Sequence, residues 1–345
     1  MSLPLRASVA TAPPTSDFAA DLLAALARQP RSMAPKYFYD AAGSALFDRI
    51  CQLPEYYPTR TELGILQAHA HDMAQQVGPH AEVVEFGAGS LHKVRLLLGA
   101  LQQPARYVPI DISGEHLQAA AQALRADHPN LQVQPLVADY TQDFALPAWD
   151  HAAHPGQVPG QVPGQVPGRR LGFFPGSTMG NFSPGEALAF LRRAALLLRG
   201  GGLLLGVDLV KDPALLHAAY SDSAGVTAAF NLNLLARANR ELGANFDLAQ
   251  FAHAAFYNAP LQRIEMHLQS RRRQQVQLCG QRFEFAEGET LHTEKSYKFT
   301  LEGVRALAAQ AGFVPGPCWT DPRQWFSLHW LQAPPIPTHP LKDTP

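Results

Sequence analysis

Short apolar runs alternate with amphipathic segments along the middle of the chain, between about residues 81 and 210. The apolar runs predict β-strands, and the segments between them repeat their apolar positions at the spacing of an α-helix. The predicted strands are 81–86, 107–112, 131–137, 171–174 and 203–210, and the predicted helices are 91–101, 114–126 and 184–198. Residues 203–210 are almost all apolar, which is typical of a strand buried on both faces. This alternation predicts an α/β fold with a doubly wound parallel sheet.

The flanking regions follow other patterns. Helical spacing recurs at 17–28, 61–77, much of 211–257 and 301–311, and strand-like runs lie at 263–278, near Phe283 and at 325–331. Residues 35–60 are dense in tyrosine and proline, which predicts a rigid, irregular segment. We therefore expect an α/β domain formed by 62–210 plus 299–333, and a smaller α+β domain formed by 17–61 plus 211–298.

Two segments lack the periodicity of a packed element. Residues 155–168 repeat the unit Pro-Gly-Gln-Val, and residues 334–345 are rich in proline. Such compositions are typical of exposed linkers. We expect the first to form a loop without a catalytic role and the second to be a flexible tail.

The charge of the chain is nearly balanced, with 28 basic and 29 acidic residues and a formal net charge of −1. This excludes the strongly basic surface of a nucleic-acid-binding protein. Apolar runs stay short of the ~18 residues that a membrane-spanning helix needs, and the first residues lack the apolar core of a signal peptide. The three cysteines are too far apart for a disulfide framework or a metal site. We expect a cytoplasmic monomer without nucleic-acid or membrane partners.

The strongest local motif is Val83-Val84-Glu85-Phe86-Gly87-Ala88-Gly89-Ser90, where a predicted strand runs into a predicted helix. Gly87 and Gly89 allow a tight turn and a close approach of the backbone to a ligand. A dinucleotide-binding fingerprint needs a third glycine where this chain has His92. The motif therefore favours a cofactor without phosphates, and Lys93 in the first turn can reach a carboxylate.

Acidic residues stand at the ends of successive predicted strands. Asp111 can accept hydrogen bonds from both hydroxyls of a ribose, and Asp139 can hold an adenine amino group beside Tyr140. Together with Glu85, this pattern is typical of a site for S-adenosylmethionine. The alternative is that each carboxylate only stabilises a turn.

Two further segments carry candidate substrate-binding residues. Asn181 follows the fourth predicted strand in a loop rich in glycine and small polar residues, where it can present a donor and an acceptor to an amino acid. Alternatively, Asn181 only caps the turn before the next helix. Glu294 and Ser296 point the same way if their segment is extended, which suits a ring with two nitrogens such as imidazole; an exposed polar strand is the alternative. The histidines show no metal-binding spacing, so we expect no metal.

The sequence resembles the bacterial L-histidine Nα-methyltransferases of ergothioneine biosynthesis from about Pro35 to Leu331. The resemblance is carried by these segments: Pro35-Lys36-Tyr37-Phe38-Tyr39-Asp40, Leu53-Pro54-Glu55-Tyr56-Tyr57-Pro58-Thr59-Arg60-Thr61-Glu62, Gly176-Ser177-Thr178-Met179-Gly180-Asn181, Asp208-Leu209-Val210-Lys211-Asp212, Tyr220, Ala224-Gly225-Val226-Thr227-Ala228-Ala229-Phe230-Asn231 and Thr293-Glu294-Lys295-Ser296-Tyr297-Lys298-Phe299. It implies a Rossmann-like class I methyltransferase domain with a second, substrate-binding domain.

The resemblance also implies roles for individual residues. S-adenosylmethionine would be held by Gly87, Lys93, Asp111, Asp139 and Tyr140. The amino and carboxylate groups of L-histidine would be held by Tyr56, Asn181 and Tyr220, its imidazole by Glu294 and Ser296, and Tyr39 would lie near the amine. The reaction implied is trimethylation of the α-amine to hercynine, in which Tyr39, Tyr56 and Asn181 position the nitrogen.

Three other functions compete with this hypothesis. A related enzyme could methylate another amino acid such as a tryptophan derivative, although the carboxylate of Glu294 suits imidazole better. A nicotinamide-dependent oxidoreductase is disfavoured by the missing third glycine. An inactive adenosine-binding scaffold is disfavoured because all the matched polar residues are present.

Overall fold

The computed structural model describes residues 17–89, 91–148 and 168–335. These residues form two compact units. The first consists of the residues up to Phe38 together with Ala228–Ala254 and Met266–Glu294; the second consists of Tyr39–Thr227, Ala255–Glu265 and the residues from Lys295 onward. The predicted Pro-Gly-Gln-Val loop, apart from Gly168, and residues 336–345 of the predicted tail lie outside the described residues.

An eight-stranded sheet forms the centre of the second unit. Its order is β13 (Val314–Thr320), β14 (Phe326–Gln332), β7 (Gly202–Asp208), β6 (Arg170–Phe174), β2 (Glu82–Phe86), β3 (Arg106–Asp111) and β4 (Gln132–Val133), and β5 (Leu136–Val137) also pairs with β3. Neighbouring strands from β7 to β4 are parallel, whereas β14 is antiparallel to both β7 and β13. The predicted doubly wound parallel sheet is confirmed, with an antiparallel edge.

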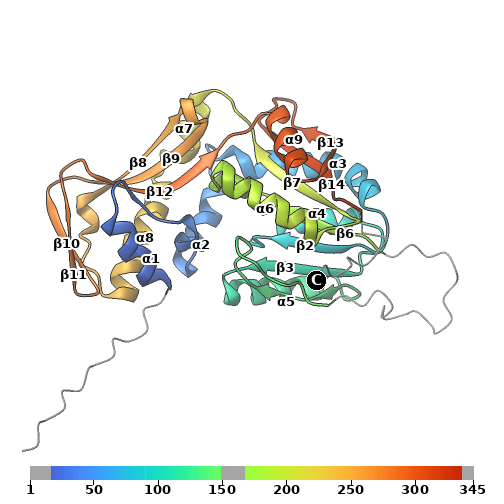
Figure 1. Cartoon of the computed structure of the whole chain (residues 1–345), viewed down its shortest axis with the longest axis horizontal. Helices are drawn as coiled ribbons and strands as arrows, with labels where there is room; N and C mark the ends of the chain where they lie inside the picture. The colour runs from blue at the N-terminus through green and yellow to red at the C-terminus, as the bar shows by residue number, and fades with distance from the viewer. Residues whose placement is uncertain (1–16, 90, 149–167, 336–345) are drawn as a thin grey trace, which may run out of the picture. The chain divides into compact units, whose positions relative to one another are not determined.

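Helices cover both faces of this sheet, as Figure 1 shows. One apolar cluster joins the sheet to α3 (Tyr57–Val77), α4 (His92–Ala100) and α5 (Gly114–Asp127), and the other joins it to α6 (Pro184–Leu197) and α9 (Leu301–Gln310). Successive strand residues belong to opposite clusters: Val83 packs in the first and Val84 in the second. The strands are therefore buried on both faces, which explains their continuous apolar runs.

Local chemistry sets several of the helix boundaries. The Ser183 side chain caps the start of α6 and Glu186 bonds back to the Ser183 backbone, with Pro184 in the first turn. Pro58 likewise lies in the first turn of α3, so this helix begins at Tyr57 rather than at the predicted residue 61. Asp40 caps α2 (Ala41–Ile50), a helix that lies within the stretch predicted to be irregular. That prediction was wrong for 41–50.

The remaining α-helices and strands come from the N-terminal part of the chain and from its 211–298 region. The other helices are α1 (Asp17–Ala27), α7 (Pro213–Tyr220) and α8 (Val226–Leu242). A four-stranded sheet has the order β1 (Arg31–Ser32), β12 (Thr290–Tyr297), β9 (Arg263–Ser270) and β8 (Phe251–Asn258), and a hairpin pairs β10 (Gln274–Leu278) with β11 (Gln281–Phe285). Residues 251–257 therefore form a strand rather than the predicted helix, because pairing with β9 outweighs the helix propensity of their alanines.

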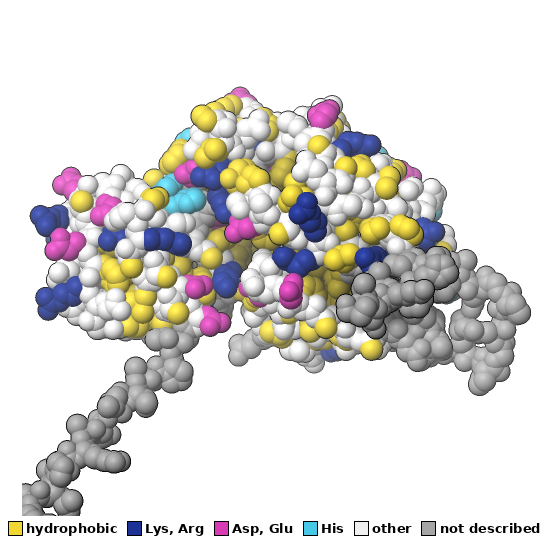
Figure 2. All heavy atoms as spheres, viewed as in Figure 1, with side chains coloured by type: hydrophobic (Ala, Val, Ile, Leu, Met, Phe, Trp, Pro, Cys, Tyr) yellow, Lys and Arg dark blue, Asp and Glu magenta, His cyan; other side chains and the backbone are white. Residues whose placement is uncertain are grey.

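The surface agrees with the balanced composition. Basic and acidic side chains are interspersed over the described part of the face shown in Figure 2. Among the described helices, none combines the length and the apolar composition that crossing a membrane requires.

A buried histidine makes the stability of the second unit sensitive to acid. His329 on β14 is 1% exposed, and its Nε2 lies 2.9 Å from the Ser327 hydroxyl. Burial, helped by the positive charge of Arg305, lowers the pKa of His329 to about 4. The unfolded chain therefore takes up this proton first as the pH falls below ~6.5, and the stabilisation present above that pH is lost as the pH approaches the folded-state pKa.

We expect the His329→Gln variant to lose less stability in acid than the unmodified protein. The expected difference in the free energy of unfolding between neutral pH and about pH 4.5 is about 2–3 kcal/mol for this one group. Urea denaturation at both pH values measures it, and His71→Gln, at an exposed position on α3, is the control. Equal acid sensitivity of His329→Gln and the unmodified protein would contradict the assignment.

Candidate active site

The order of strands in the large sheet reverses at β2, which pairs with β3 on one side and with β6 on the other. Open α/β sheets bind ligands at the carboxyl ends of the strands at such a point. Gly87 directly follows β2 with φ of 73°, a conformation that favours glycine. A Cβ atom at Gly87 would lie 3.4 Å from the hydroxyl oxygen of Tyr140, so the predicted cofactor residues Gly87 and Tyr140 lie side by side.

Lys93 is held in place by a buried carboxylate. Its Nζ lies 2.6 Å from an oxygen of Glu62, which is fully buried on α3 and also accepts a hydrogen bond from the Gly176 amide at 2.9 Å. Lys93 is 14% exposed. Its ammonium is therefore fixed near the loop that follows β6, where it can receive a carboxylate. The role of Glu62 could not be predicted from the sequence pattern.

The strand-end carboxylates differ in their surroundings. Asp111 accepts a hydrogen bond from the Ser113 amide, and Asp139 accepts hydrogen bonds from the amide and hydroxyl of Thr141. Both contacts are of the kind expected if these carboxylates only stabilise turns. They also fix the orientation of both carboxylates. Glu85 is buried and bonds to the Tyr107 hydroxyl; burial raises the pKa of Glu85 to about 8, so it is mostly protonated at neutral pH.

A row of aromatic rings leads through the second unit. Tyr39 contacts Phe47 edge to face at 5.6 Å between ring centroids, Phe47 contacts Tyr56 at 6.2 Å, and Tyr56 contacts Tyr220 at 6.3 Å. α2 supplies Phe47 and α7 supplies Tyr220. The predicted residues Tyr39, Tyr56 and Tyr220 are therefore connected through one series of ring contacts. Phe47 was missed by the sequence analysis, because nothing in its local sequence separates it from a core residue.

Asn181 ends the short helix η2 (Thr178–Asn181), which packs against the end of β12. A Cβ atom at Gly180 would lie only 2.9 Å from the carbonyl oxygen of Tyr297, so the two backbones approach closely. Asn181 and Ser296 are each one residue away from this contact.

Ser296 and Tyr220 are linked to a buried lysine. The Tyr220 hydroxyl donates to Ser296 Oγ at 2.8 Å, and Lys298 Nζ donates to Ser296 Oγ at 2.9 Å and to the Tyr220 hydroxyl at 3.2 Å. Lys298 also forms an ion pair with Asp208 at 2.9 Å, in which both side chains are 1% exposed. The predicted pair of Tyr220 and Ser296 is therefore positioned by a charged group.

Asp208 joins this lysine to a second one. It accepts hydrogen bonds from the Tyr57 hydroxyl, at 2.8 Å for the shorter contact, and from Lys211. Burial acts to raise the pKa of Asp208, but Lys298 and Lys211 hold it below its ordinary value. Burial lowers the pKa of Lys211 to about 8 against the attraction of Asp208. No local sequence pattern predicts this cluster, because its residues meet only in the folded chain.

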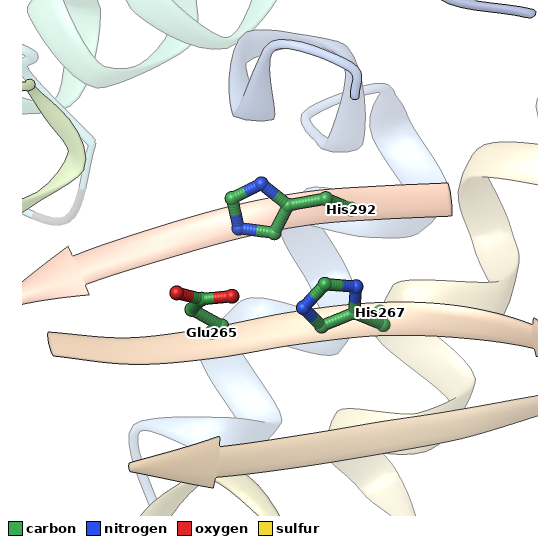
Figure 3. A group of neighbouring side chains, drawn as sticks. All are labelled: Glu265, His267 and His292. Atoms are coloured by element: carbon green, nitrogen blue, oxygen red, sulfur yellow. The ribbon is translucent and has the colours of Figure 1, made fainter. Parts of the chain in front are cut away.

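Glu294 lies two residues before Ser296 on β12. The same sheet carries three side chains of the kinds that can bind a metal ion, shown in Figure 3: Glu265 and His267 on β9 and His292 on β12. Glu265 is engaged by Arg263 at 2.7 Å and by Asn258 at 2.9 Å. The rings of His267 and His292 stack at 4.7 Å between centroids. Glu265, His267 and His292 offer two imidazole nitrogens and a carboxylate oxygen within 4.8 Å of one another, and the carboxylate is already engaged in the ion pair with Arg263.

Comparison with known proteins identifies the family. A family described as "Histidine-specific methyltransferase, SAM-dependent" matches residues 18–333. The chain belongs to this family. Its central sheet, with helices on both faces and the antiparallel strand β14 between β7 and β13, is accordingly that of a class I SAM-dependent methyltransferase.

Individual members of the family are similar to most of this chain. The chain is 42% identical over 314 residues to a protein named "Histidine N-alpha-methyltransferase" from Mycolicibacterium smegmatis, and 40% identical over 314 residues to one of the same name from Mycobacterium tuberculosis. Each alignment covers 89% of this chain and 92% of the relative. A Neurospora crassa protein named "Ergothioneine biosynthesis protein 1" is 28% identical over 88% of this chain, which corresponds to 33% of that longer protein.

Proposed function

We propose that this histidine-specific methyltransferase transfers methyl groups from S-adenosylmethionine to the α-amino nitrogen of L-histidine, three times in succession, to give hercynine. The observation that carries the proposal is the row of rings from Tyr39 to Tyr220, which ends on the hydroxyl of Ser296. Its aromatic faces suit an amine that becomes a quaternary cation, and its polar end suits a hydrogen-bonding side chain. The mycobacterial and Neurospora relatives support placing the product at the start of ergothioneine biosynthesis.

The residues at the carboxyl ends of β2 and β3 fit S-adenosylmethionine. Lys93 would pair with its carboxylate, Asp111 would accept hydrogen bonds from its ribose, and Asp139 and Tyr140 would contact its adenine. Gly87 keeps the turn after β2 free of a side chain beside Tyr140. When bound, this co-substrate supplies a methyl group already activated by a sulfonium.

The protein must then present an unprotonated amine in line with that methyl group. Tyr39, Tyr56 and Asn181 would hold the nitrogen, and Tyr220 would contact the amino acid's polar backbone groups. Each transfer removes an N–H donor and adds bulk, so the site must receive an increasingly apolar group. The faces of the tyrosine rings would stabilise the final cation by roughly 0.5–2 kcal/mol through cation–π attraction.

The imidazole side chain would be held by Glu294 and Ser296. We also propose that residues 17–61 and 211–298 form the substrate-binding domain, since most of the substrate residues belong to them or adjoin them.

We expect Glu294→Ala to raise the KM for histidine by about 10- to 100-fold, because a hydrogen bond to a charged group is worth about 1.5–3 kcal/mol. The KM for S-adenosylmethionine should change less than about 2-fold, since a substitution away from the cofactor residues usually changes free energies by less than ~0.5 kcal/mol. Steady-state kinetics with each substrate varied measure both constants, and the exposed Glu287→Ala is the matched control. An unchanged KM for histidine would remove Glu294 from the site.

The proposed reaction is tested by mass spectrometry of the purified protein incubated with S-adenosylmethionine and each of the common amino acids separately. Gains of one, two and three methyl groups on histidine alone would establish the substrate and the number of transfers. Methylation of tryptophan or another amino acid instead would keep the cofactor assignment and overturn the roles of Glu294 and Ser296.

A further inference from the structure

Lys298 has no remaining donor capacity, since an ammonium carries three N–H groups and no acceptor. One N–H points to Asp208 at 2.9 Å, one to Ser296 Oγ at 2.9 Å and one to the Tyr220 hydroxyl at 3.2 Å. The lysine is 3% exposed, so water does not compete for these contacts. Burial acts to lower the pKa of Lys298, but the neighbouring carboxylate of Asp208 holds it above its ordinary value, so this side chain is charged.

The ammonium of Lys298 helps to decide whether the Ser296 hydroxyl donates or accepts a hydrogen bond toward a ligand. A hydroxyl group has two lone pairs and one hydrogen. The lone pairs of Ser296 Oγ accept from Lys298 and from the Tyr220 hydroxyl, which lies 2.8 Å away. The hydroxyl hydrogen of Ser296 must therefore point away from both, and this side chain can only donate to a ligand.

We propose that Lys298, anchored by Asp208, is a positioning residue that locks Ser296 as a hydrogen-bond donor, so that the site accepts a neutral imidazole with a lone pair on one nitrogen and rejects the imidazolium ion. The inference rests on the proposed function, in which Ser296 faces the imidazole ring. An imidazolium has no lone pair to receive the Ser296 hydrogen, so its binding would forfeit this hydrogen bond and leave two donors, an O–H and an N–H, facing each other. The site would thus select histidine by the protonation state of its ring as well as by the shape of the ring.

Several titratable groups surround Lys298 and Asp208. Asp208 comes from β7, Tyr57 from α3, Tyr220 from α7 and Tyr257 from β8, and Lys211 follows β7. Burial raises the pKa of Tyr57 and of Tyr257 above their ordinary values, and Asp208 stays ionised because its pKa is lowered. Lys211, with a pKa of about 8, sets the upper pH limit of the experiment.

The test compares L-histidine with 1,2,4-triazolylalanine, whose ring offers an N–H and lone pairs but stays neutral in mild acid. Both substrates share the α-amine, so the ratio of their kcat/KM values isolates the ring. With an imidazole pKa of ~6.5, the ratio of histidine to triazolylalanine should fall by about 30-fold from about pH 7.5 to about pH 5. A ratio that stays constant would overturn the proposal, while methylation of neither substrate would overturn the proposed function instead.

Lys298→Met tests the role of the lysine, because methionine keeps much of the side-chain volume without the charge. In this variant Ser296 regains an acceptor lone pair, so the ratio should change by less than about 3-fold over the same pH range, which corresponds to under ~0.7 kcal/mol. A folded variant that keeps the full 30-fold pH dependence would remove Lys298 from this role. If Lys298→Met does not fold, Ser296→Ala carries the test, since it removes the donor itself: the same flattening is expected, and an unchanged pH dependence would contradict the proposal.

Discussion

The Asp208→Asn variant is expected to lose about 3–5 kcal/mol of its free energy of unfolding, because removing one partner of a buried ion pair leaves uncompensated charge in the interior. Asp208 is 1% exposed and neutralises two lysines, of which Lys298 is 1% exposed and Lys211 is 4% exposed by side chain. Asparagine has nearly the same shape, so the loss reports the charge rather than a cavity.

Urea denaturation at neutral pH measures this loss. The matched control is Asp72→Asn on α3, where the side chain is 59% exposed and a change within about 0.5 kcal/mol is expected. A loss below about 1 kcal/mol in Asp208→Asn would mean that the two lysines find other partners or lose their protons, since such a loss is typical of a single ordinary hydrogen bond. Because Lys298 contacts both Ser296 and Tyr220, the variant should also weaken histidine binding if those residues hold the substrate.

The alternation of apolar runs and amphipathic helices predicted the large sheet because both faces of its central strands are buried. The prediction was wrong where pairing or local capping decided the structure. Residues 131–137 form two short strands, because Pro135 interrupts the run. The edge strand β13 was missed since its Pro315 and Pro317 argue against a strand; the register shifts between Pro315 and Cys318, which accommodates them at the sheet edge.

The candidate site likewise contains residues that the sequence could predict and residues that it could not. Gly87, Asp111 and Asp139 could be singled out because they lie at the carboxyl ends of strands: Gly87 follows β2, Asp111 ends β3 and Asp139 lies two residues after β5. This is the edge where ligands bind in this kind of sheet. Their roles in holding a cofactor stay predictions. Glu62 and the cluster around Asp208 could not be found, since their partners are far away in the sequence: Glu62 meets Gly176, and Asp208 meets Tyr57 and Lys298.

The Gly206→Ala variant is expected to affect stability and cofactor binding together. A Cβ atom at Gly206, on β7, would lie 2.2 Å from Oε1 of Glu62 and 3.2 Å from the ring of Phe326. Glu62 is fully buried and holds both the Gly176 amide and Lys93, so its carboxylate has little freedom to move aside. Overpacking of a core typically costs about 1–3 kcal/mol, and we expect the upper end here.

Displacement of Glu62 should also move Lys93, which we propose to bind the carboxylate of S-adenosylmethionine. We therefore expect the KM for S-adenosylmethionine to rise by about 10-fold or more, the equivalent of losing one charge-assisted hydrogen bond. Denaturation and steady-state kinetics measure the two effects. Gly64→Ala and Gly99→Ala are matched controls, because a Cβ atom there has no heavy atom within 4 Å and both lie in helices, where alanine should add about 0.5–1 kcal/mol. A destabilised Gly206→Ala protein with an unchanged KM would separate Glu62 from cofactor binding and leave it a purely structural role.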